Sequence, residues 1–208
     1  TNPMALIKLL DLNYSVVYSS HMILEFIKDK DYKAIHTFNK FNLAELDKNG
    51  ILFASKIFSD DESNEYINCI KHIIDHSEDL YFTDQTTGLN MLHILCYKCK
   101  NNTIFEYIYN ILCSKDINAF NVIDNKLQFP LNYAHRSSNS FAIKKLLELN
   151  NSIEYDADMI IEFIKDKNYK IAYKFDKFNL VQIVANGLLF ISNIFQDDDS
   201  IEYVDCVK

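Results

Sequence analysis

The chain has 208 residues and a formal net charge of −8, which argues against nucleic acid as a ligand because phosphate binding relies on clustered positive charge. Its hydrophobic content of 49% supports a packed core, while three glycines and two prolines are fewer than strand-rich folds usually need. No apolar run approaches the ~20 residues of a membrane span, so we expect no membrane insertion.

An internal duplication organises the chain. Residues 5–71 recur without a gap as residues 142–208, and 37 of the 67 aligned positions are identical at an offset of 137 residues. The segment MILEFIKDKDYK at 22–33 returns as MIIEFIKDKNYK at 159–170. A repeat this clean indicates a modular fold, and modular folds usually extend a surface rather than enclose an active site.

Apolar residues recur at i, i+3 and i+4 along the chain, which predicts short helices with one apolar stripe. The stripes are Leu6, Leu9 and Leu10; Ile23, Phe26 and Ile27; Ile104, Tyr107, Ile108, Ile111 and Leu112; and Ile143, Leu146 and Leu147. Such helices are marginal alone and must stack on neighbours. We therefore expect an all-α fold built from a row of helix pairs. The recurring phenylalanines are interpreted as core between repeats: Phe26, Phe38, Phe41, Phe53 and Phe58.

The three glycines, Gly50, Gly88 and Gly187, each precede a short apolar helix pattern. Asn-Gly, present at Gly50 and Gly187, favours a turn with positive φ, which glycine adopts without steric cost. Glycine is therefore expected where a tight turn recurs.

A turn of this kind followed by two short helices resembles the ankyrin repeat. Gly88 to Cys96 lies over the family's G-x-T-P-L-H-x-A-A pattern, with His93 on the histidine. Residues 124–134 match again, with Leu127 in place of glycine and Asn132 in place of histidine, and residues 141–153 resemble the second helix with the turn that follows it. The resemblance implies an ankyrin-type helical solenoid of stacked helix-turn-helix repeats.

Turn positions divide the chain into segments with an average length of about 34 residues. This length is close to the ankyrin period. We expect a single solenoid over 1–208, with repeats 1–16 (partial), 17–46, 47–83, 84–123, 124–153, 154–183 and 184–208 (partial). The departures are the missing Thr-Pro dipeptides and insertions in 47–83 and 84–123.

One group of residues has metal-ligand spacing. His93, Cys96 and Cys99, with Cys69, His72 and Cys113 as further candidates, resemble a tetrahedral zinc set. The alternative is structural: in the ankyrin pattern the histidine ring bonds the backbone of the adjacent hairpin, and buried free cysteine packs as a small hydrophobe. We prefer the structural interpretation and expect no metal and no other cofactor.

Catalytic patterns are missing from the sequence: it has no Gly-x-Ser-x-Gly, phosphate loop, Gly-x-Gly-x-x-Gly or His-Glu-x-x-His. The remaining histidines have no nucleophile at a diagnostic spacing, and His36 becomes Tyr173 in the second copy. We therefore expect no enzymatic activity. The acidic runs 60–62 and 197–199 lack the pattern of a calcium loop and are interpreted as helix-start caps.

The resemblance implies a scaffold or adaptor that binds a protein partner through its hairpin tips and the concave face of its first helices. The predicted partner-binding residues are Thr86, Leu89, Asn90, Phe120, Val122, Asn125 and Gln128. Phe120 and Val122 are singled out as exposed apolar anchors. Two alternatives stay open: a regulatory or targeting segment of a larger enzyme, and a structural repeat that self-associates end to end.

An odd number of cysteines, five, predicts reduced thiols and a cytoplasmic location. The wealth of Asn, Ile, Lys, Tyr and Phe beside a single arginine, Arg136, is typical of an AT-rich genome. That composition points to a protist, a large DNA virus or a host-dependent bacterium, so delivery into a host cell is included in the intracellular expectation.

Overall fold

The computed structural model describes residues 19–115, 120–148, 157–165, 167 and 169 and divides the chain into two compact units, Thr1–Leu146 and Leu147–Lys208. In the described residues the backbone forms helices and isolated β-bridges but no strand, so the fold is all-α, as predicted. No helix in that part of the chain has the length and hydropathy required to cross a bilayer.

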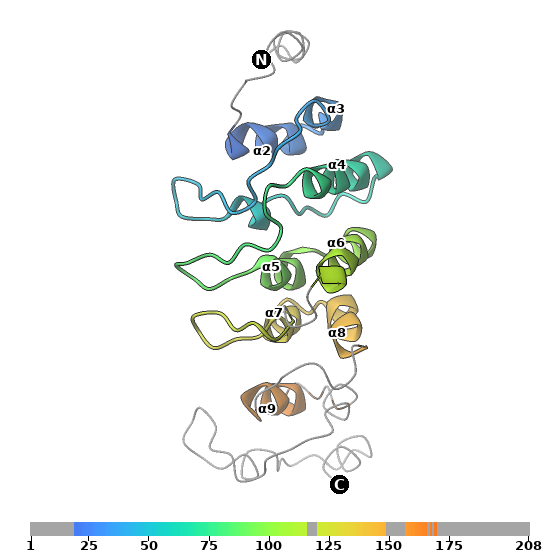
Figure 1. The fold of residues 1–208 in the computed structure, drawn as a ribbon. Coiled ribbons are helices and arrows are strands. Elements are labelled where there is room, and N and C mark those ends of the chain that lie inside the picture. Colours follow the sequence, from blue (N-terminus) through green and yellow to red (C-terminus); the bar gives the residue numbers. More distant parts are fainter. Residues whose placement is uncertain (1–18, 116–119, 149–156, 166, 168, 170–208) are drawn as a thin grey trace. The chain divides into compact units, whose positions relative to one another are not determined.

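Helices in the first unit are short and come in pairs. In chain order they are α2 (Ser20–Lys28), α3 (Tyr32–Ile35), the 3-10 helix η1 (Phe53–Ser55), α4 (Asn64–Asp75), α5 (Met91–Lys98), α6 (Asn102–Lys115), α7 (Pro130–Arg136) and α8 (Ser140–Leu147). Helix α9 (Ala157–Lys165) belongs to the second unit. Helix α5 packs against η1 and α7, while α4 packs against α3 and α6. Figure 1 shows η1, α5 and α7 in one column and α4, α6 and α8 in a second.

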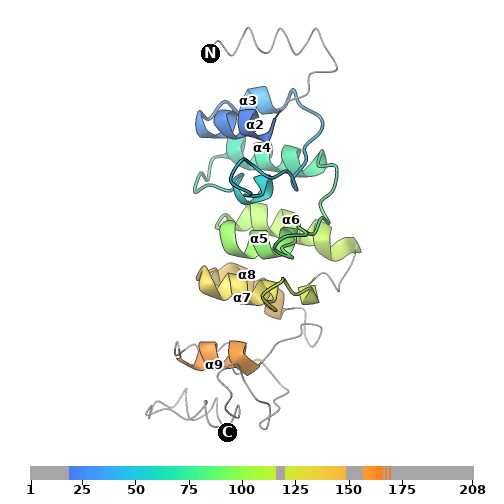
Figure 2. The same cartoon turned by 90° about the vertical axis from the view of Figure 1, so that its left-hand side faces the viewer.

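Successive pairs form layers, and the loops that connect them project on one side. Figure 2, turned so that this side faces the viewer, shows α2 with α3, α4 with η1, α5 with α6, and α7 with α8 at successive levels. Three of the projecting loops are hairpin turns, around residues 47–50, 84–88 and 124–128. We call this side of the first unit the hairpin edge.

The core lies between the two columns. Of the recurring phenylalanines, Phe38, Phe41 and Phe53 are buried as expected, whereas Phe26 and Phe58 are half-buried. The largest fully buried side chains include Tyr66 of α4 and Phe105 of α6. Burying a side chain of this size contributes about 1.5–3 kcal/mol, so the stability of these short helices comes from stacking.

Residues 51–58 form only the short η1 turn where the sequence pattern predicts a helix. The buried Tyr66 accounts for the difference, because its hydroxyl accepts the Ser59 N–H at 2.7 Å and donates to the Ile57 carbonyl at 2.9 Å. These backbone groups are thereby paired without a helical turn. An irregular stretch from 56 to 63 then leads into α4.

The start of α4 is capped as the sequence predicts. The Ser63 hydroxyl accepts the Tyr66 N–H at 3.2 Å, and Asp61 accepts the Ser63 N–H at 2.8 Å. Asp61 also accepts the Tyr32 hydroxyl at 2.8 Å and pairs with Lys30 at 3.0 Å, which ties α3 to the start of α4. Hydrogen bonds from Ser63, Tyr32 and Lys30 hold the pKa of Asp61 far below its usual range.

The second unit repeats the first in its described part. Helix α9 begins and ends 137 residues after α2, and Lys167 has φ 56° where its equivalent Lys30 has φ 57°. The exposed fractions of equivalent side chains are also similar: 0% and 2% for Ile23 and Ile160, 8% and 3% for Ile27 and Ile164, and 7% and 6% for Tyr32 and Tyr169. The duplicated sequence therefore gives the same local structure.

We predict that Tyr66→Phe lowers the free energy of unfolding by about 1–3 kcal/mol, because the Ser59 N–H and the Ile57 carbonyl lose a buried partner. Urea unfolding followed by circular dichroism measures this change. Tyr97→Phe, which removes the hydroxyl of a side chain that is 42% exposed, is the matched control and should leave stability within about 0.5 kcal/mol. Equal effects of the two substitutions would contradict the role given to Tyr66.

Candidate functional site

Three turns on the hairpin edge begin with an aspartate whose carboxylate closes the turn. The distances from carboxylate oxygen to backbone nitrogen are 2.8 and 2.9 Å for Asn49 and Ile51 at Asp47, 2.9 Å for Thr87 at Asp84, and 2.8 and 2.9 Å for Lys126 and Gln128 at Asp124. A hydrogen bond to Lys56, followed by the backbone bonds, lowers the pKa of Asp47 to about 2. The turns are therefore closed by their own side chains.

Each turn also contains a residue with positive φ: 71° at Gly50, 75° at Gly88 and 59° at Leu127. Leu127 occupies the place of glycine, as the alignment with the ankyrin pattern indicated. A non-glycine residue in this region costs about 1–2 kcal/mol. Leu127 is also 70% exposed, so its side chain does not offset that strain by burial.

The second and third turns are joined directly. The backbone N–H of Asn125 donates to the Thr87 carbonyl at 3.0 Å, and its side-chain amide donates to the Thr86 carbonyl at 2.9 Å. Gly88 makes this approach possible, because a Cβ atom there would lie 2.6 Å from the Asn125 nitrogen. Two hairpins about 40 residues apart in sequence thus form one continuous surface.

His93 connects the same two repeats from inside. Its ring is 0% exposed, and Nε2 donates to the Gln128 carbonyl at 3.0 Å. Nδ1 then accepts the Asn90 N–H at 3.3 Å, while Asn90 caps α5 by accepting the His93 N–H at 3.1 Å. Burial lowers the pKa of His93 and favours the neutral ring. The bond to the adjacent hairpin that the ankyrin pattern implies is therefore present.

The candidate zinc ligands serve as packing and hydrogen-bonding groups. Cys69, Cys96 and Cys99 are each at most 2% exposed, and burial raises the pKa of Cys69 and of Cys99 to about 12. Both ring nitrogens of His93 are engaged in the bonds given above. Within the described ranges no group of three His, Cys, Asp or Glu side chains has a geometry that could hold a metal ion.

The predicted partner-binding residues do not all lie on the surface. Thr86 and Asn125 are exposed at the tips, and Leu89, Val122 and Gln128 are half-buried. Asn90 is 8% exposed because it caps α5. Phe120 is 2% exposed and packs on the Tyr109 ring with centroids 5.5 Å apart, so its expected exposure is not observed.

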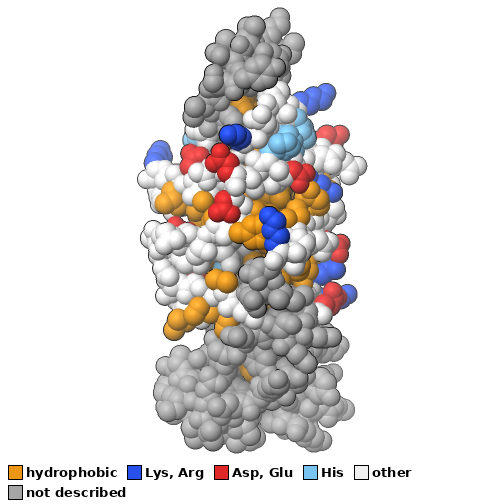
Figure 3. Space-filling model, in the orientation of Figure 1, with side chains coloured by type: hydrophobic (Ala, Val, Ile, Leu, Met, Phe, Trp, Pro, Cys, Tyr) orange, Lys and Arg blue, Asp and Glu red, His pale blue; other side chains and the backbone are white. Residues whose placement is uncertain are grey.

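Other apolar side chains occupy the exposed positions of the hairpin edge. Exposed fractions are 45% for Leu46, 44% for Ile51, 42% for Ile123 and 70% for Leu127. Figure 3 shows hydrophobic side chains as separate spots on this side, over the loops that Figure 1 draws there. We call these four residues the apolar edge set. They flank or occupy the Asp-led turns, which is the sequence signal that could have identified them.

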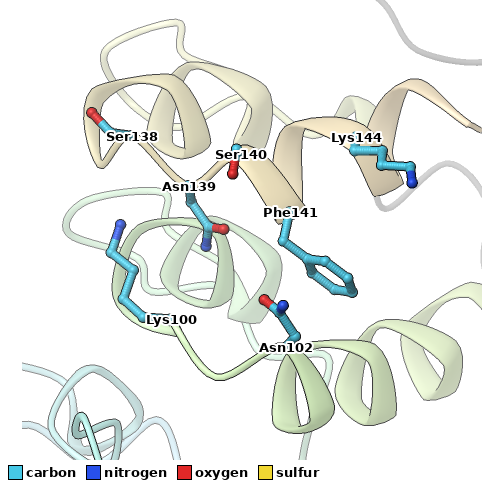
Figure 4. A pocket seen from close by; sticks show the side chains of 7 residues that line it. All are labelled: Lys100, Asn102, Ser138, Asn139, Ser140, Phe141 and Lys144. Atoms are coloured by element: carbon cyan, nitrogen blue, oxygen red, sulfur yellow. The ribbon is translucent and has the colours of Figure 1, made fainter.

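A pocket of about 410 Å³ lies where the loop between α5 and α6 meets the start of α8 (Figure 4). The Lys100 ammonium donates to the Ser137 carbonyl, and the Asn139 amide donates to the Cys99 carbonyl at 2.7 Å. Figure 4 shows Lys144 pointing away from Lys100, so the two cations do not converge on one ligand position. The polar groups of this pocket hold the two loops together.

Comparison with known protein families, curated proteins and solved structures finds no match to this chain.

We predict that Gly88→Ala destabilises the protein by about 2–4 kcal/mol, since it combines positive-φ strain with the loss of a hydrogen bond at Asn125. Gly50→Ala is the matched control, because φ there is 71° but nothing lies within 4 Å of the added carbon. It should cost only about 1–2 kcal/mol of strain. Thermal unfolding of both variants measures the difference, and a Gly50 effect as large as the Gly88 effect would argue against close turn-to-turn contact.

Proposed function

We propose that the chain is an ankyrin-type solenoid. The proposal is supported by three Asp-led turns with positive φ, by helix pairs in successive layers, and by the buried His93 ring that bonds the next hairpin at Gln128. Two features depart from the ankyrin pattern: α3 is a single turn, and η1 replaces the first helix of the 47–83 segment. These departures shorten individual helices but leave the three Asp-led turns in place.

We further propose that the protein is a scaffold that binds another protein at the hairpin edge, without catalysis of its own. The observation that carries this proposal is the apolar edge set, because four large apolar side chains stand exposed on tightly closed turns. Exposed apolar side chains that gather in a patch mark contact surfaces, and these four lie as one pair beside the first turn and one pair at the third. A partner that covered them would gain the free energy of removing them from water.

The rigidity of the turns supports the same proposal. Asp124 fixes the backbone of the third turn, and Asn125 ties that turn to the second at Thr86 and Thr87. A partner that docks on such turns does not have to order them first, which removes one of the costs of association. Leu127, held at positive φ with its side chain in solvent, is the strongest candidate anchor.

Site-specific photo-crosslinking tests the proposal in a lysate of cells that contain the protein. A photoreactive residue placed at position 127 should give a defined protein adduct. The same residue at Asn110, which is exposed on α6 away from the turns, should not. Equal adduct formation from the two positions, or none from position 127, would contradict binding at the hairpin edge.

Leu127→Asn provides the matching affinity measurement once the adduct is identified. Asparagine tolerates positive φ, so this variant removes the apolar side chain without adding strain. We expect about tenfold weaker binding, the effect of losing one apolar anchor of about 1.4 kcal/mol. Binding unchanged in a variant that keeps its helical circular dichroism would remove Leu127 from the interface.

A further inference from the structure

Three histidines gather on the surface over α3 and α4, well away from the hairpin turns. The ring centroid of His72, on α4, lies 4.6 Å from that of His36, which follows α3, and 4.2 Å from that of His76, which follows α4. Figure 3 shows the histidine side chains as one patch on this face. His36 and His76 are exposed, and His72 is half-buried between them.

The cluster lies where residues 36–41 contact α4. His72 Nε2 donates to the Phe38 carbonyl at 2.7 Å. The His72 and Phe41 rings pack edge to face, with their centroids 5.8 Å apart. Backbone bonds continue this contact, because the Phe41 N–H donates to the His76 carbonyl at 3.0 Å and the Glu78 N–H donates to the Phe41 carbonyl at 2.9 Å. Residues 36–41 are thus attached to the C-terminal end of α4.

His72 and His76 each use one ring nitrogen in a hydrogen bond to a backbone carbonyl, which leaves the other nitrogen outside these bonds. His72 uses Nε2 for the Phe38 carbonyl, and His76 uses Nδ1 to donate to the His72 carbonyl at 2.9 Å. Protonation therefore adds charge at His72 Nδ1 and His76 Nε2 without requiring either bond to break. The cost of protonation arises between the rings, since adjacent imidazolium ions repel.

Among the described residues, the Asp75 carboxylate acts on His72. Asp75 of α4 favours the charged form of His72, but Asp75 also accepts the hydroxyl of Tyr107 on α6. The Lys71 ammonium, 5.0 Å from the centre of the Tyr107 ring, adds a positive charge on the same side. A single shared carboxylate cannot neutralise three imidazolium ions.

We propose that His36, His72 and His76 form an acid-sensitive latch that holds residues 36–41 on α4 at neutral pH and loosens when the rings become charged. The latch acts on the joint between the first helix pair and α4. It is independent of the proposed binding at the hairpin edge.

The sign of the pH dependence follows from His72. Burial lowers the pKa of His72, and the neighbouring His76 and His36 lower it further, against the opposing effect of the Phe38 bond. A group whose folded pKa lies below its unfolded value of about 6.5 contributes stability that is fully present above that pH. The contribution is lost as the pH falls below about 6.5.

The internal duplication suggests which substitution to use at His36. The second copy of the duplicated sequence carries Tyr173 at the position of His36. His36→Tyr combined with His76→Gln leaves His72 and its bond to Phe38 in place while removing both adjacent charges. His21→Gln combined with His135→Gln removes the same number of histidines elsewhere and is the matched control.

Hydrogen exchange measured by mass spectrometry on the full chain tests the latch at about pH 7.5 and pH 5.5, on either side of the ordinary imidazole pKa of about 6.5. Rates are corrected for intrinsic pH dependence. In the wild type and the control, protection of residues 36–41 and 76–78 should fall about tenfold on acidification, the combined effect of two imidazolium pairs at the surface. In the His36→Tyr/His76→Gln variant, the fall should be less than about twofold.

Because the buried His93 also titrates, the readout must be local to these segments. Unchanged protection in the wild type, or an equal fall in the latch variant and the control, would overturn the proposal.

Discussion

The buried hydrogen bond from His93 to the Gln128 carbonyl is the contact on which the arrangement of the hairpin edge depends. It joins the start of α5 to the next turn across 35 residues of sequence, from a His93 ring that is fully buried to a carbonyl of the half-buried Gln128. At the exposed tips of the same two turns, Asn125 donates hydrogen bonds to the Thr86 and Thr87 carbonyls. One contact from the buried ring and two at the turn tips therefore join the second turn to the third, which carries Ile123 and Leu127 of the apolar edge set.

The duplication explains why short helices suffice in this chain. Helix α9 has the bounds, the positive-φ lysine and the buried isoleucines of α2, so the local structure is set by residues that the two copies share. The capping residues at the start of α4 recur in sequence as well, with Asp198 and Ser200 in the places of Asp61 and Ser63. In the solenoid proposed above, stability comes from many similar interfaces between neighbouring repeats.

The sequence predicted the helices, the turns and the role of His93 because each leaves a local pattern of three to five residues. It did not predict η1 or the burial of Phe120, since both depend on one distant side chain. Tyr66 pairs the backbone that η1 would have extended, and Tyr109 covers Phe120. The only sign of Leu127 in the sequence was that it stands where the ankyrin pattern has glycine, and this did not predict that its side chain is exposed.

The most direct test removes the His93 ring and measures the turn that accepts its hydrogen bond at Gln128. Hydrogen exchange of the Lys126 and Gln128 amides, which Asp124 holds, should be compared between the wild type and His93→Leu. The account predicts a loss of protection in this turn of at least about tenfold, the effect of one unpaired buried carbonyl, with no change in the turn at 47–50. Unchanged protection at residues 124–128 in a folded His93→Leu protein would contradict the claim that the repeats are coupled through this bond.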